Sequence, residues 1–81
     1  MKSYRPFKLE EFKKKFQVNS SIHYRSKKFW DERIQILTDI SEFKRDLFPI
    51  HIGNYYFALG QLFQDFEIYD NGEWKPFGVQ E

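Results

Sequence analysis

Three apolar residues near the start of the chain stand at helical spacing. Leu9, Phe12 and Phe16 occupy positions i, i+3 and i+7, which places them on one stripe of a helix over residues 8–16. Two glutamates fall in the first turn and three lysines in the last, the order that the helix dipole favours at its two ends. A helix this short is not stable alone in water, so we expect it to pack on the rest of the protein.

Alternation of apolar and polar residues predicts strands further along. Ile22 and Tyr24 alternate with polar neighbours, which indicates a short strand. Residues 33–41 are ambiguous, because helical spacing also holds from Trp30 through Leu37. We favour a strand there, since β-branched residues at every second position are a poor choice for a helix. These β-branched residues are Ile34, Ile36, Thr38 and Ile40.

A first hairpin is predicted in the second half of the chain. Gly53 and Asn54 form a two-residue loop that suits a type II′ turn, so residues 49–52 should pair with residues 55–58. Leucine and phenylalanine then recur at helical spacing over residues 59–66, which predicts a short late helix.

A second hairpin has the stronger signal, because Asn-Gly suits the positive φ angles of a type I′ turn. Asn71 and Gly72 therefore predict that residues 67–70 pair with residues 73–75. Pro76 then ends the strand or lies at the sheet edge. The aromatic segment that follows should pack back across the core, because a small domain can hardly leave all its large rings exposed.

These elements predict an α+β fold in a single domain over residues 1–81. We expect a small twisted antiparallel sheet or partial β-barrel, with an N-terminal helix and a short late helix. The residues predicted to be mostly buried are Leu9, Phe12, Phe16, Ile34, Ile36, Ile50, Ile52, Phe57, Leu62 and Phe66.

Composition adds a surplus of aromatic residues, with ten Phe, five Tyr and two Trp. Each buried ring removes roughly 150–250 Å² from water, so a few rings can form a small core and the others should lie at the surface. The absence of cysteine excludes a disulfide scaffold and a thiolate metal site. No apolar run is long enough for a signal peptide or a membrane span, so we expect a cytoplasmic protein with no membrane contact.

Charge is uneven along the chain, although the net charge is only +1. Residues 1–45 hold twelve Lys and Arg against six Asp and Glu, a balance of +6, whereas residues 46–81 hold one Lys against six acids, a balance of −5. Either the two halves attract one another and solvate the surface, or the basic half forms an anion-binding face.

No catalytic machinery is evident in the sequence. The only histidines are His23 and His51, too few for a structural zinc site, although they could join carboxylates such as Asp31 or Glu32 in a weak one. The serines lack the surroundings of a nucleophile elbow, and the four glycines are too far apart for a phosphate-binding loop. We therefore expect no enzyme activity, cofactor, metal or small-molecule substrate.

The most concentrated charge in the chain suggests a binding surface. The candidate residues are Lys13, Lys14, Lys15, Arg25, Lys27, Lys28, Phe29 and Trp30. Lysine and arginine beside exposed rings are typical of nucleic-acid surfaces, where cations contact phosphates and rings stack on bases. The same composition fits an acidic protein partner. The alternative is a solvated helix end and hairpin loop, with Trp30 in the core.

The segment that reads LFQDFE, followed by NGEWKPFGV, resembles the ends of small uncharacterised proteins from phages and other bacterial mobile elements. The resemblance covers about the last quarter of the chain and transfers no functional residue. Such proteins often bind and block a host protein, including defence systems, so the resemblance implies a non-enzymatic module with a protein partner. The alternative is a small nucleic-acid-binding β-domain with a basic face, against which the near-neutral net charge argues.

Overall fold

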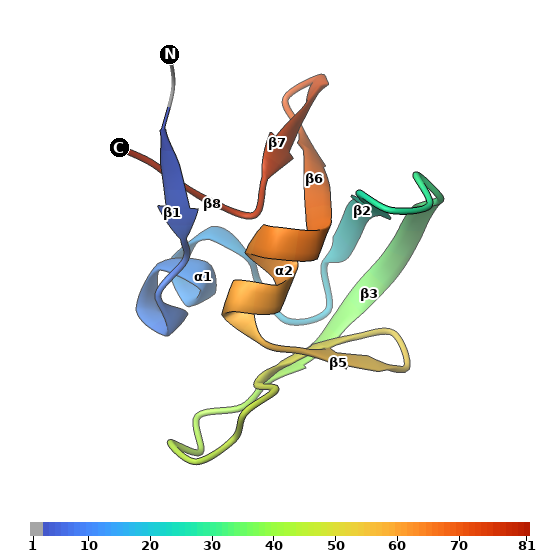
Figure 1. Cartoon of the computed structure of the whole chain (residues 1–81). Coiled ribbons are helices and arrows are strands. Elements are labelled where there is room, and N and C mark those ends of the chain that lie inside the picture. Colours follow the sequence, from blue (N-terminus) through green and yellow to red (C-terminus); the bar gives the residue numbers. More distant parts are fainter. Residues whose placement is uncertain (1–2) are drawn as a thin grey trace.

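A computed structural model of the chain describes residues 3–81 and has an α+β fold (Figure 1). In chain order its elements are β1 (Tyr4–Pro6), α1 (Leu9–Lys15), β2 (Ser21–Ser26), β3 (Glu32–Ile40), β4 (Ile50–Ile52), β5 (Tyr55–Phe57), α2 (Leu59–Asp65), β6 (Phe66–Asp70), β7 (Glu73–Pro76) and β8 (Gly78–Gln80). Six strands form one antiparallel sheet in the order β5-β4-β3-β2-β6-β7. The first and last strands, β1 and β8, pair with each other in a separate antiparallel ribbon.

The long strand β3, which runs diagonally through Figure 1, joins the two halves of the sheet. Its residues from Glu32 to Ile36 pair with β2, and its residues from Leu37 onward pair with β4. The register shifts between Leu37 and Asp39, where a bulge bends the strand. The edge strands β5 and β7 do not pair with each other in the described part of the chain, so the sheet is open and no closed barrel forms.

The first predicted hairpin is present with its predicted register. Ile50 pairs with Phe57 and Ile52 pairs with Tyr55. Gly53 has a φ of 60°, a left-handed conformation that glycine adopts at little cost.

The second hairpin is also confirmed. Tyr69 pairs with Trp74, and Asn71 and Gly72 have φ angles of 50° and 81°, as a type I′ turn requires. The ambiguous segment 33–41 is the strand β3, as the β-branched alternation indicated.

Both predicted helices are present, and each places one fully buried side chain in the core: Phe12 from α1 and Leu62 from α2. The strand β1 precedes α1, so the helix is the second element of the chain. Sequence patterns did not show β1 or β8, because three-residue strands are too short to reveal a period of two.

The core combines side chains from both helices, the sheet and the C-terminal segment. Its members are Phe7, Phe12, Phe16, Ile22, Tyr24, Leu37, Ile50, Ile52, Phe57, Leu62, Ile68 and Phe77. Two other predicted core residues, Leu9 and Phe66, are partly buried and pack against this core. The burial of Phe77 confirms that the aromatic C-terminal segment packs back across the sheet.

The prediction that Ile34 and Ile36 are buried is wrong. Their side chains are 68% and 43% exposed, whereas the neighbouring Leu37 is fully buried. The reason lies in the adjacent strand β2, where Tyr24 points into the core and its hydroxyl donates a hydrogen bond to the Gln35 side chain. Because side chains alternate across a strand, an inward Gln35 forces both isoleucines outward.

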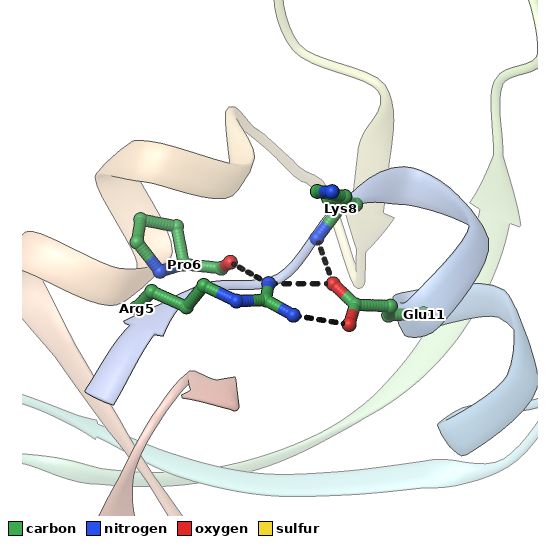
Figure 2. A network of polar contacts seen from close by, with 4 residues as sticks. All are labelled: Arg5, Pro6, Lys8 and Glu11. Carbon is green, nitrogen blue, oxygen red and sulfur yellow. Dashed lines mark hydrogen bonds and ion pairs between the residues drawn. The ribbon is translucent and has the colours of Figure 1, made fainter. Parts of the chain in front are cut away.

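A polar network ties β1 to the start of α1 (Figure 2). The Arg5 guanidinium donates hydrogen bonds of 2.8 and 2.6 Å to the two Glu11 carboxylate oxygens, and one of 3.2 Å to the Pro6 carbonyl oxygen. The Lys8 backbone N–H donates a further bond of 2.9 Å to Glu11. The hydrogen bonds from Arg5 first, and from Lys8 second, lower the pKa of Glu11 to about 2.

Two glycines predict opposite responses to the same substitution. Gly60 lies in α2 with no atom within 4 Å of an added Cβ, so Gly60→Ala should stabilise the protein by about 0.5–1 kcal/mol. At Gly78 an added Cβ would lie 2.2 Å from the Arg5 carbonyl oxygen, so Gly78→Ala should force β1 and β8 apart and cost on the order of 1–3 kcal/mol. Urea denaturation measures both changes, and a destabilised Gly60→Ala would contradict the helix assignment.

The low pKa of Glu11 predicts a stability that depends on pH. A carboxyl whose folded pKa lies below its unfolded value stabilises the fold above the unfolded pKa, and this contribution is lost as pH falls through the folded pKa. Stability should therefore fall between about pH 5 and pH 2, and Glu11→Gln should fall less over that range. Urea denaturation at several pH values tests this; equal pH dependence in the two proteins would mean that the pair with Arg5 does not persist in solution.

Candidate functional site

One face of the sheet, on the side away from the buried core, carries exposed apolar side chains. It carries the outward-facing side chains of β2, β3, β6 and β7, and we call it the outer sheet face. Its residues are His23, Arg25, Ile34, Ile36, Glu67, Tyr69 and Trp74. Strand pairing places them on one surface, because residues opposite each other in antiparallel strands point to the same side.

Three rings gather on the outer sheet face. The ring of His23 lies 5.0 Å from that of Tyr69 and 5.2 Å from that of Trp74, and the last two rings are 5.1 Å apart. These distances are typical of attractive aromatic contacts. Ile34 stands directly opposite His23 in the pairing of β2 with β3, so an exposed aliphatic side chain borders the rings.

Arg25 connects the rings to the turn between β2 and β3. Its guanidinium carbon lies 4.1 Å from the centre of the Trp74 ring and 4.7 Å from that of the Trp30 ring. The same guanidinium donates hydrogen bonds of 3.0 and 2.8 Å to the Glu67 carboxylate. Arg25 is therefore fixed between two indoles, and its charge is balanced by a neighbour.

The three lysines of the predicted basic site lie at the end of α1. Lys13 forms an ion pair with Glu42, beyond the end of β3, and Lys15 forms one of 3.2 Å with Asp70, at the end of β6. Lys14 has no carboxylate within 4.0 Å among residues 3–81. Two of the three cations are thus already paired within the protein.

Lys27 and Lys28 belong to the opposite end of the sheet. The Lys27 backbone N–H donates to the carbonyl oxygen of Asp65, immediately before β6, whereas Asp70 lies at the other end of that strand. At about 3.3 Å per residue, β6 separates the two groups of lysines by about 16 Å. The structure therefore divides the expected single basic surface into two groups.

The remaining candidates cluster at the turn between β2 and β3. Phe29 and Trp30 are 70% and 56% exposed, so Trp30 is not in the core. The ammonium group of Lys28 lies 5.3 Å from the centre of the Phe29 ring, and that of Lys27 donates a bond of 3.2 Å to the carbonyl oxygen of Phe63. A hollow of about 580 Å³ opens beside this turn. It is lined by Ser26, Lys27, Lys28, Phe29, Gln61, Gln64, Asp65 and Phe66.

Sequence analysis found Arg25 and Trp30 but missed the outer sheet face itself. The available signal was that Leu37 stands at the opposite parity from Ile34 and Ile36, so only one of the two sets could be buried. Deciding whether Leu37 or the two isoleucines are buried requires knowing which side chains of the neighbouring strand β2 face the core. The burial of Tyr24 shows this orientation.

A second exposed apolar group lies at the far end of β3. In the loop of residues 41–49 the side chains of Phe43, Leu47 and Phe48 are all exposed. The loop ends are joined by a backbone hydrogen bond of 2.8 Å from Ser41 to Pro49, so this segment has a defined shape. It projects from the body of the molecule at the bottom of Figure 1.

Within residues 3–81 no group of three His, Asp or Glu side chains is placed to hold a metal ion. His23 pairs with Glu32 at 3.0 Å, and His51 lies 3.8 Å from Asp39. None of the helices in the described range is long and apolar enough to cross a membrane. No family model, curated protein or solved structure matches the chain.

The distribution of cations predicts that the protein does not bind nucleic acid at micromolar concentrations. We expect no binding of a short single-stranded oligonucleotide at about 10 µM protein and low salt, because the lysines form no continuous track along which several phosphates could be contacted. Fluorescence anisotropy measures this for the wild type beside a variant that combines Lys27→Glu with Lys28→Glu. Saturable binding that this variant loses would show that the turn does contact phosphates.

Proposed function

We propose that this protein is a non-enzymatic binding module whose outer sheet face docks on another protein. The observation that carries the proposal is the exposure of Ile34 and Ile36 on the outer sheet face. Interface centres are rich in aromatic residues and arginine, and the neighbouring rings and Arg25 match that composition.

Charge supports a protein partner rather than a nucleic acid. On the outer sheet face Arg25 is paired with Glu67, and His23 is paired with Glu32. A nucleic-acid surface relies on cations that are free to replace the counterions of phosphates. A face whose charges are already balanced suits a partner that contributes mainly apolar surface.

The resemblance of the C-terminal segment to proteins of phages and other mobile elements suggests the biological setting of this binding. In the proposed setting the module attaches to a host protein, such as a component of a defence system, and blocks it by occupying its surface. Such a role requires a stable scaffold and an exposed complementary face, and it requires no catalytic group.

Affinity capture from the native cells tests the proposal. We expect a stoichiometric protein partner that remains after nuclease treatment and is lost with Ile34→Asp, because a carboxylate in the centre of an apolar interface would be buried without a partner. The substitution should leave the fold intact, since the side chain is largely exposed in the free protein.

The matched control is Leu47→Asp, which introduces the same charge at an equally exposed aliphatic residue in the loop 41–49. Capture should survive this substitution. Loss with Leu47→Asp alone would move the interface to the loop, and recovery that depends on nucleic acid would favour the β-domain that binds nucleic acid.

A further inference from the structure

We infer that Trp30 is held in a strained backbone conformation so that its ring can anchor the interface, in an apolar pocket bordered by carboxylates on the partner protein. This inference rests on the proposed function. It adds the residue that dominates the proposed interface and the chemistry of the partner that this residue recognises.

The backbone of Trp30 is the first observation. Its φ is 57°, in the left-handed region that side chains with a Cβ rarely adopt. The other described non-glycine residues with positive φ are Asn19 and Asn71, and asparagine tolerates this conformation. Trp30 is therefore the one bulky residue in the described range that the fold holds in an unfavourable conformation.

Packing does not explain why a tryptophan occupies this position. More than half of the Trp30 surface is exposed, so its ring contributes little to the core. Closing the turn does not need the ring either, because the Trp30 backbone N–H donates to the Ser26 carbonyl oxygen at 2.8 Å, and glycine could make the same bond. Backbone strain that the packing of the residue does not offset is typical of functional sites.

The ring is also held in place before any partner arrives. One face of the Trp30 indole lies against Arg25, which is fixed on its other side by Trp74 and at its edge by Glu67. An anchor that is ordered in advance loses less conformational entropy on binding, and exposed tryptophan and arginine are the residue types that dominate interface energies.

The charges beside Trp30 indicate what borders the partner's pocket. Among residues 3–81 no carboxylate lies within 4.0 Å of the ammonium group of Lys27 or Lys28, while Arg25 already has its carboxylate. A partner that seats the indole therefore meets two unpaired cations and gains from carboxylates placed opposite them.

The first arm of the test needs no partner. Trp30→Gly and Trp30→Ala both remove the ring, but only alanine keeps a Cβ at positive φ. We expect Trp30→Gly to unfold at a higher urea concentration than Trp30→Ala. At the neighbouring Phe29, whose φ is not positive, the glycine variant should unfold at the lower concentration. If the glycine and alanine variants unfolded in the same order at both positions, the backbone of Trp30 would not be strained and the inference would be overturned.

The second arm uses a displayed library of random linear peptides as the probe, selected on the wild-type protein. We expect peptides with Asp or Glu beside apolar residues, at least tenfold weaker binding to Trp30→Gly, and unchanged binding to Leu47→Asp. Selection of basic peptides, selection of none, or equal binding to Trp30→Gly would overturn the inference. So would an oligonucleotide bound through Trp30, which would assign the ring to base stacking.

The two arms separate this inference from the proposed function. If Ile34→Asp abolishes capture of a protein partner while Trp30→Gly does not, the outer sheet face binds protein and Trp30 is not its anchor. If neither substitution affects capture, the proposed function itself fails.

Discussion

The structure depends on the burial of one tyrosine. Tyr24 is fully enclosed, and its ring contacts those of Phe57, Phe66 and Phe77, so it joins β2 to β5, β6 and the C-terminal segment. Burial raises the pKa of its hydroxyl further above neutral pH, and a buried hydroxyl needs a hydrogen-bond acceptor in the interior. Gln35 supplies that acceptor. Because Gln35 points inward, it decides which side chains in the first half of β3 face the core and which face outward. The exposed isoleucines of the outer sheet face thus follow from a polar requirement in the core.

Two ion pairs join the basic first half of the sequence to its acidic second half. Lys15 pairs with Asp70 and Arg25 pairs with Glu67, so cations of the first half meet carboxylates of the second half across the sheet. Partly exposed pairs of this kind contribute little to stability, and their main effect is to cancel charge at the surface. Lys15 and Arg25 are thereby neutralised, whereas Lys27 and Lys28 have no carboxylate within 4.0 Å among residues 3–81, so charge that a partner can recognise remains at the turn between β2 and β3.

Local signals in the sequence were sufficient to predict most of the helices and strands, but not to predict the outer sheet face. The hairpin turns at Gly53 and Asn71 were predictable because they depend on the conformations of two residues each. The stripe of α1 was predictable because a helix presents its apolar residues at a fixed spacing. The orientation of β3 was not, because Ile34 and Leu37 are equally apolar and only the neighbouring strand decides which is buried. The pairing of Lys13 with Glu42 and of Lys15 with Asp70 was not predictable for a similar reason, since each carboxylate lies more than 25 residues away along the chain.

Two departures from local preference are connected through the outer sheet face. Ile34 exposes a β-branched side chain that folding alone would bury, and Trp30 holds a bulky residue at positive φ. Sequences that fold reliably are locally consistent, and the exceptions concentrate where function requires them. Here both exceptions border the same cluster, because Ile34 stands opposite His23, whose ring contacts Trp74, and Trp74 stacks on the arginine that supports Trp30. A contiguous surface of this kind, ordered by its own stacking contacts, can bind a partner without first paying the entropy of assembling the site.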